Sequence, residues 1–171
     1  AIECYLKSLQ ILESAIGTNN SSYVAVLICL ANSYVAIKEY ALAEDAQLKA
    51  LSIQNATIGK EHPNYVSTLS NLGVLYQIIG DNVKAEQYLL EGINISKLLY
   101  GEEHREYGKQ LYNLGALYYE CGNYHKAEPY VLASNTMYKQ QYITSLSYMS
   151  EEQRERSEEH TSELQSPGLI S

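Results

Sequence analysis

Histidine and cysteine are the residue types in this 171-residue chain that could bind a metal or act as a nucleophile. His62 and His104 occupy equivalent loops 42 residues apart. Equivalent atoms of neighbouring helical units lie about 8–10 Å or more apart, and a shared metal would need bonds of about 2 Å to both imidazoles. We therefore predict loop or capping roles for both histidines, and we predict no metal site.

The three cysteines lie far apart in the sequence, at Cys4, Cys29 and Cys121. A nucleophilic thiol needs a base within hydrogen-bond reach, and no Cys–His spacing here suggests one. Burial as small hydrophobic residues explains Cys29 and Cys121, and an odd number of isolated cysteines is typical of a reducing, cytoplasmic compartment. No phosphate-binding loop and no paired carboxylates occur. We predict no catalytic residue, no cofactor and no enzyme activity.

The net charge of the chain argues against two classes of binding partner. The chain has 12 Lys and Arg against 20 Asp and Glu, which gives a net charge of −8. Nucleic acids and anionic membranes require a basic surface, so we predict neither as a partner. The longest apolar run covers eight residues, 24–31, whereas a membrane-spanning helix needs about 20.

An internal repeat of 42 residues positions these side chains. Segment 70–86 aligns with 112–128 without insertion, and the same pattern is present 42 residues earlier. Apolar residues within each unit follow helical spacing. Gly80 suits a left-handed helix end and Asp81 suits an N-cap, so each unit is a pair of helices joined by a tight turn. The fold class is therefore all-α, a solenoid of stacked antiparallel helix pairs.

The repeat predicts the organisation of the whole chain. Residues 1–20 are the second helix of a truncated repeat, and full repeats cover 21–62, 63–104 and 105–141. Residues 142–155 form a linker segment, and 156–171 form a tail that we exclude from functional reasoning. Since the chain begins with Ala and not Met, we expect it to be part of a longer protein.

Several repeat positions carry specific expectations. The small residues Ala31, Gly73 and Gly115 should allow close helix approach. Three glutamates at the 42-residue spacing suggest a solvated or inter-repeat hydrogen-bonding position, and these are Glu44, Glu86 and Glu128. Lys38 replaces the turn glycine, so that turn should be less left-handed. Pro129 lies inside a predicted helix and can kink it.

The repeat resembles a known family. The positions Leu72, Gly73, Tyr76, Gly80 and Ala85 are similar to the signature of tetratricopeptide repeats, as are Leu89 and Gly92. The 42-residue period and the Gly-x-x-His-Pro loop at 59–63 resemble the kinesin-light-chain variant, which also occurs in bacterial repeat proteins. The resemblance covers about 1–141. It implies a right-handed superhelix whose concave face, lined by the first helix of each pair, binds a peptide or partner protein.

The register of that family implies a set of groove residues. The candidates are Asn32, Ser70, Asn71, Gln77, Lys109, Tyr112, Asn113 and Tyr119. Asn71 and Asn113 are equivalent, and a side-chain amide can pair with the backbone of an extended peptide. Alternatively, these amides bond only to neighbouring helices. Because basic residues are scarce, we do not expect the carboxylate-binding clamp of some tetratricopeptide domains.

A second resemblance lies in segment 139–156, KQQYITSLSYMSEEQRER. It is similar to the segment that follows the repeats in bacterial proteins ending in a CHAT domain, a caspase-like cysteine protease. The motif positions are occupied by Tyr148, Met149, Ser150, Glu151, Glu152 and Arg154. This resemblance implies an alternative function, a regulatory sensor arm whose C-terminal effector domain is missing here.

The last residues resemble something other than native protein. The string RSEEHTSELQSP at 156–167 is similar to the translation of a sequencing-library adapter, and it shares no periodicity with the repeats. A charged disordered tail is the alternative.

Overall fold

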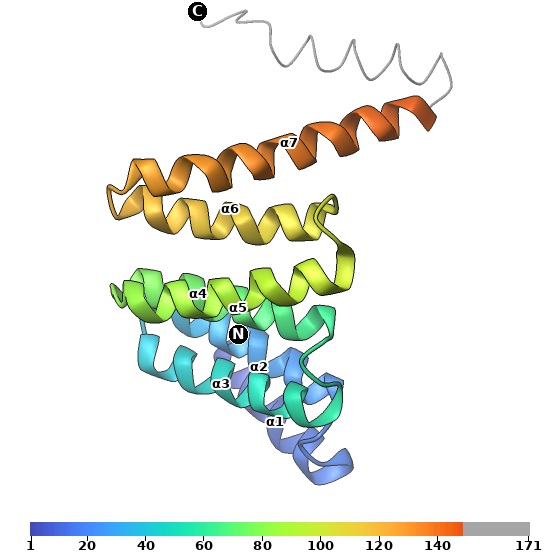
Figure 1. Ribbon diagram of the computed structural model, residues 1–171. Coiled ribbons are helices and arrows are strands. Elements are labelled where there is room, and N and C mark those ends of the chain that lie inside the picture. The colour runs from blue at the N-terminus through green and yellow to red at the C-terminus, as the bar shows by residue number, and fades with distance from the viewer. Residues whose placement is uncertain (149–171) are drawn as a thin grey trace, which may run out of the picture.

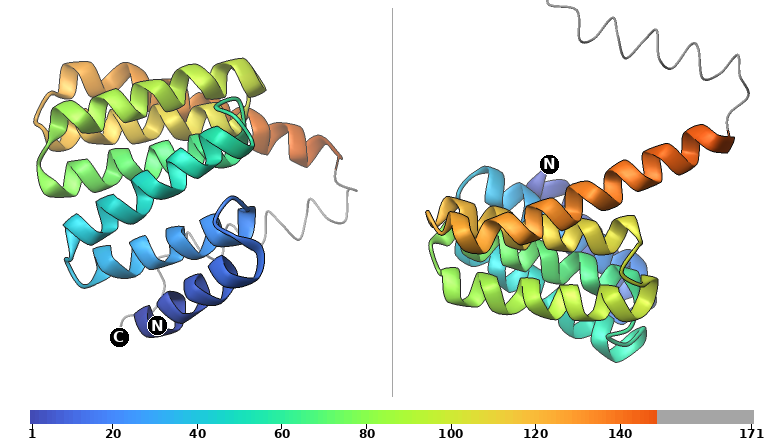
Figure 2. Two further views of the ribbon diagram at one scale, coloured as in Figure 1. Left: turned by 90° about the horizontal axis from the view of Figure 1, so that it is seen from below. Right: turned by 45° about the horizontal axis from the view of Figure 1, so that its top comes forward.

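The computed structural model describes residues 1–148, which form seven helices and contain no strand. The helices are α1 (Ile2–Ile16), α2 (Ser21–Ala36), α3 (Tyr40–Thr57), α4 (Pro63–Ile79), α5 (Asn82–Tyr100), α6 (Arg105–Glu120) and α7 (Tyr124–Tyr148). Successive helices contact each other along the stack, with α2–α3, α4–α5 and α6–α7 forming the repeat pairs (Figures 1 and 2). The predicted all-α solenoid is confirmed. The tail at 156–171 lies outside the described residues.

The turn inside each pair is built the same way in all three repeats. Gly80 has φ +91°, and the N–H of Asp81 donates to the carbonyl of Tyr76 at 2.9 Å. Equivalent backbone bonds close the other two turns, at the same distance. The expectation for Lys38 was wrong, since this residue adopts φ +64° and keeps the turn left-handed. The two flanking helices impose the turn, although a side chain makes it less favourable.

The loops between pairs end in histidine N-caps. Nδ1 of His62 accepts from the backbone N–H of Asn64, and Nδ1 of His104 accepts from Glu106, each at 3.1 Å. Pro63 occupies the first turn of α4, where a missing N–H costs nothing. The predicted capping role of both histidines is confirmed.

Small residues bring the two helices of a pair together. A Cβ added at Gly73 would lie 2.6 Å from the side chain of Leu89, and one at Gly115 would lie 2.8 Å from Val131. Ala31, at the equivalent position, is fully buried. The predicted close helix approach is confirmed, because no larger side chain fits there.

Glutamates connect neighbouring repeats. The hydroxyl of Tyr76 donates to Glu44, and the hydroxyl of Tyr118 donates to Glu86. Burial, followed by the hydrogen bond to the carboxylate, raises the pKa of each phenol above its ordinary value. The inter-repeat position predicted for the glutamates is confirmed for these two pairs.

Two further features differ from expectation. Helix α7 continues through Pro129 to Tyr148, so the first residues of the predicted linker, 142–148, are helical. Cys29 and Cys121 are exposed, and their predicted burial was wrong. Cys29 lies on the open side of α2 and Cys121 at the end of α6, where no neighbouring helix covers them. No helix within 1–148 is both long and apolar enough to cross a bilayer.

Candidate functional site

The first helices of the three pairs line a continuous surface, which we call the α2–α4–α6 groove. Between α2 and α4 lies a hollow of about 130 Å³, and between α4 and α6 lies one of about 320 Å³. Val74 and Ile78 of α4 line both hollows, so the two lie next to each other. A third hollow of about 740 Å³ shares Tyr112 and Asn113 with the second and extends onto α7.

Three asparagines follow the groove. Asn32 and Asn71 face the first hollow, and Asn113 faces the second and third. Among the described residues, none of these three side-chain amides makes a hydrogen bond to the protein. Each therefore offers both a donor and an acceptor to a ligand, which matches the pattern of a peptide backbone.

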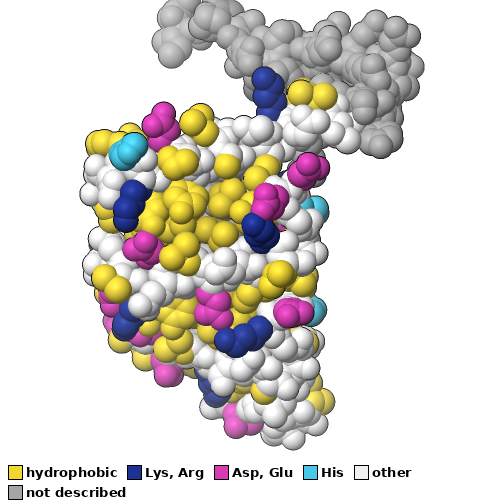
Figure 3. Space-filling view, in the orientation of Figure 1, with side chains coloured by type: hydrophobic (Ala, Val, Ile, Leu, Met, Phe, Trp, Pro, Cys, Tyr) yellow, Lys and Arg dark blue, Asp and Glu magenta, His cyan; other side chains and the backbone are white. Residues whose placement is uncertain are grey.

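Apolar side chains accompany the amides. Val74 is 41% exposed, Ile78 47% and Tyr112 51%. Exposed apolar groups of this kind release water on binding, and this supplies most of the affinity for a peptide side chain. The space-filling view shows a different face, with α3 and α5 in front of α2 and α4, and on this face too apolar side chains gather beside α6 with charged ones around them (Figure 3).

The structure places two of the candidate groove residues, Ser70 and Tyr119, outside the α2–α4–α6 groove. Ser70 is buried in the α4–α6 interface, where its hydroxyl donates to Oε1 of Gln110 at 2.5 Å. It therefore contributes to packing and does not face the groove. Tyr119 is exposed but packs edge-on against Tyr124 with ring centroids 5.1 Å apart, in a separate hollow at the turn between α6 and α7. Gln77 lines the second hollow.

The third hollow is basic and rich in tyrosine. Arg105 and Lys109 line it together with Tyr112, and α7 contributes Tyr138 and Tyr142. Lys109 makes no ion pair with any carboxylate in the described part of the chain. The sequence analysis missed the two α7 tyrosines because it assigned the groove to the first helix of each pair alone, although their spacing of four residues places them on one helix face.

The described residues contain no group of side chains suited to a metal ion. No three His, Cys, Asp or Glu side chains between 1 and 148 lie close enough together to hold a metal ion. The groove is lined by amides, phenols, aliphatic groups and a few charges. Such a surface can bind through hydrogen bonds and apolar contact.

Comparisons with known proteins agree with this geometry. Residues 22–97 match the family model of the tetratricopeptide repeat, so that resemblance is confirmed. The chain is similar to the crystal structure of BtubC (BKLC) from P. vanneervenii, with a TM-score of 0.75 and 22% identity over 82% of this chain and 56% of that one. The comparison with curated proteins gives no match.

Two further solved structures share the fold. One is a candidate kinesin light chain of Podosopora anserina with nearly identical TPR-like repeats, at a TM-score of 0.70 and 20% identity over 82% of this chain and 66% of that one. A single-substitution variant of that protein gives a TM-score of 0.73 and 19% identity over 83% of this chain and 67% of the variant. The chain thus spans little more than half of the first structure and about two thirds of the others. These likenesses show the right-handed superhelical fold.

Proposed function

We propose that this chain, in which residues 22–97 form tetratricopeptide repeats, is a protein-interaction scaffold that binds an extended peptide in the α2–α4–α6 groove. Tetratricopeptide repeats generally mediate protein–protein interaction and act as scaffolds without catalysis. One observation carries the proposal: the free amides of Asn32, Asn71 and Asn113 lie beside exposed apolar side chains on one continuous surface.

The groove residues make two kinds of contact with the peptide. The asparagine amides bond to the peptide backbone, each contributing about 0.5–1.5 kcal/mol net. Val74, Ile78 and Tyr112 contact apolar side chains. Because the amides recognise backbone and the apolar surface recognises side chains, the second group sets specificity.

A displayed peptide library selected on the intact chain tests the proposal. Asn71→Ala together with Asn113→Ala should weaken binding of the selected peptides about tenfold, which corresponds to two lost hydrogen bonds. The matched control is Asn94→Ala, an exposed asparagine on α5 outside the groove. Equal affinities of the double variant and the control would reject groove recognition.

The CHAT-like motif supports a second candidate, a regulatory arm of a longer caspase-like cysteine protease. In this version, a peptide bound in the groove controls a protease domain beyond the motif at 139–156. The described part of that motif, up to Tyr148, continues α7 directly. Sequencing the gene past codon 155 tests this candidate, since a following domain without a His/Cys pair would exclude it.

We also propose a cytoplasmic location. The support is chemical, because Cys4, Cys29 and Cys121 are free and exposed, a state that persists in a reducing compartment. Localisation of a tagged full-length protein tests it, and secretion would contradict it.

A further inference from the structure

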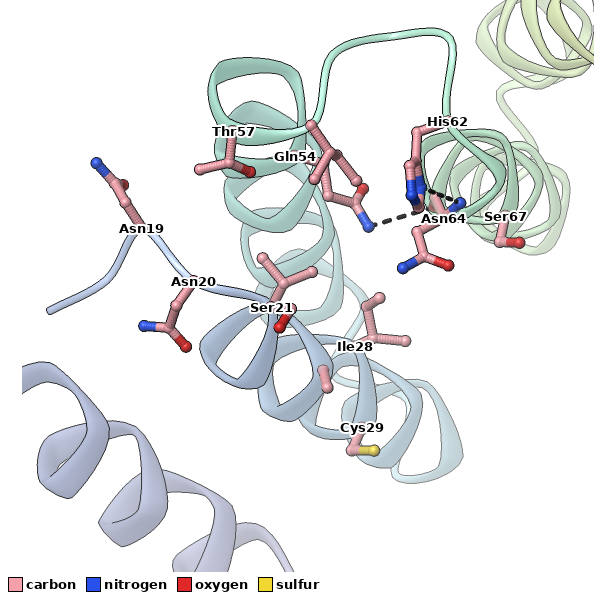
Figure 4. A pocket seen from close by; sticks show the side chains of 13 residues that line it. Asn19, Asn20, Ser21, Ile28, Cys29, Gln54, Thr57, His62, Asn64 and Ser67 are labelled. Atoms are coloured by element: carbon pink, nitrogen blue, oxygen red, sulfur yellow. Dashed lines mark hydrogen bonds between the residues drawn. The ribbon is translucent and has the colours of Figure 1, made fainter. Parts of the chain in front are cut away.

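A pocket of about 660 Å³ opens between the amino-terminal halves of α2 and α4, beside the small first hollow of the groove (Figure 4). We call it the α2–α4 pocket. Its apolar lining is Val24, Ala25, Ile28 and Ile58. Its remaining lining is Asn19, Asn20, Ser21, Cys29, Gln54, Thr57, His62, Asn64 and Ser67.

The repeat explains why space remains here. At the next interface, between α4 and α6, Gln110 reaches across and accepts a hydrogen bond from Ser70. The positions equivalent to Gln110 and Ser70 are Thr68 and Ile28. The shorter Thr68 side chain bonds back to the carbonyl of Asn64 at 3.1 Å, so it does not bridge the two helices.

The loop side of the pocket is also lined by smaller residues. Leu99 of the next repeat is replaced here by Thr57, and Tyr100 is replaced by Ile58. Tyr100 stacks on His104 with ring centroids 4.7 Å apart. No aromatic ring covers His62 in this way within the described chain, and its imidazole lines the pocket.

The pocket lining contains no Asp, Glu, Lys or Arg. A charged ligand group would therefore lose water without gaining an opposite charge, which is costly. The apolar lining favours an apolar side chain instead. The pocket therefore selects uncharged groups.

Polar groups in the lining can recognise a peptide backbone. Nδ1 of His62 accepts a hydrogen bond, so Nε2 of the neutral ring carries the proton and can donate. The side-chain amide of Asn64 makes no bond to the described residues. Gln54, which is 2% exposed, donates to the carbonyl of Asn64 at 3.2 Å and points toward His62 and Asn64 (Figure 4). Its Oε1 has no partner, so an acceptor remains for a ligand N–H.

We infer that the α2–α4 pocket binds an uncharged peptide segment carrying one apolar side chain. The side chain contacts Val24 and Ile28, and the backbone bonds to Asn64 and His62. This inference rests on the proposed function and extends it, because it assigns the neutral part of a bound peptide to the first two repeats.

Cys29 allows a test without a known partner, since its exposed thiol lies in the pocket lining. In a Cys4→Ser/Cys121→Ser variant of the full chain, Cys29 is the single thiol. The probes are the cysteamine amides of N-acetyl-leucine, N-acetyl-glutamate and N-acetyl-lysine, each joined through its thiol to a second cysteamine as a mixed disulfide, and the mixed disulfide of butanethiol with cysteamine. The Cys29 thiolate attacks the disulfide, forms a new disulfide with the probe thiol and releases cysteamine. Mass spectrometry under a fixed reductant concentration measures the captured fraction. We expect the leucine probe to be captured at least tenfold more strongly than the other three.

Two filled variants and one control complete the test. Thr57→Leu copies the next repeat on an exposed position, and Ile28→Ser/Thr68→Gln copies its Ser–Gln pair. Both should remove the preference for the leucine probe, while circular dichroism reports that the helices are intact. A Cys4→Ser/Cys29→Ser chain, with Cys121 alone, should capture all probes equally.

Several outcomes would overturn the inference. Equal capture of charged and leucine probes would exclude selection for uncharged groups, and equal capture of the butyl probe would exclude peptide recognition. An unchanged preference in Thr57→Leu would place the probe elsewhere. If the pocket test fails while Asn71→Ala/Asn113→Ala still loses selected peptides, only the pocket assignment falls and the proposed groove function stands.

Discussion

The hydroxyl of Tyr118 donates a hydrogen bond to Oε1 of Glu86, which lies 32 residues earlier in the chain. Tyr76 and Glu44 repeat the bond at the same separation. In both cases the tyrosine belongs to the first helix of one repeat and the glutamate to the second helix of the preceding repeat. Lys126 lies over the Tyr118 ring, 5.2 Å from its centroid. Each bond therefore joins two consecutive repeats.

Removing the Tyr118 hydroxyl should destabilise the contact between the second and third repeats. Tyr118→Phe leaves the partly buried carboxylate of Glu86 without its donor, and we expect a loss of about 1–2 kcal/mol in the free energy of unfolding. Urea denaturation followed by circular dichroism measures the change. Tyr124→Phe is the control, because Tyr124 is exposed and its hydroxyl makes no hydrogen bond to the described residues. Equal stability of the two variants would contradict the prediction.

The same bonds predict a weakness at alkaline pH. The pKa of the Tyr76 and Tyr118 phenols is raised in the folded protein, first by burial and then by the carboxylate. A raised folded pKa gives stability that is fully present below the ordinary tyrosine value of 10 and is lost as the pH rises above it. Unfolding midpoints measured from about pH 8 to about pH 11.5 should fall less steeply for Tyr118→Phe than for the native chain. If the unfolding midpoints of the two chains fell in parallel with pH, the raised pKa of Tyr118 would not be the cause of the alkaline destabilisation.

Lys38 offers a route to a more stable chain. A residue with a side chain at φ +64° carries a cost of about 1–2 kcal/mol that glycine avoids. Part of the stabilisation from removing this strain is offset, because glycine loses more conformational entropy on folding than lysine does. We expect Lys38→Gly to raise the free energy of unfolding by about 0.5–1 kcal/mol. The reciprocal variant, Gly80→Ala at φ +91°, should lower it by a similar amount. Thermal unfolding checks both, and a destabilised Lys38→Gly would contradict the expectation.

The sequence predicted the fold well because its signals are local and repeated. The 42-residue spacing, the turn at Gly80 and the caps at His62 and His104 each depend on a few neighbouring residues. The same holds for Gly73, where a small residue at a repeated position predicted a close helix contact that the structure confirms.

The site was predicted less well because it depends on the direction of individual side chains. Ser70 and Asn71 are adjacent in sequence, but on a helix they point about 100° apart, and only Asn71 faces the groove. Cys29 was assigned to the core because cysteine is often buried, although α2 turns it toward the open side.

The α2–α4 pocket could not be seen in the sequence. It depends on the combined volume of side chains from α2, α3, α4 and the loops between them, and no single residue signals it. Only after the repeats are superimposed does the replacement of Gln110 by Thr68 appear as missing volume.

The tyrosine–glutamate hydrogen bonds also affect how the number of repeats in such a chain can change. Because donor and acceptor recur with the period of the repeat, excision of one whole unit, 63–104, would bring Tyr118 to the place of Tyr76, opposite Glu44. The new junction would regenerate the same bond from residues already present. For this one bond, whole units can thus be gained or lost by recombination without a compensating mutation.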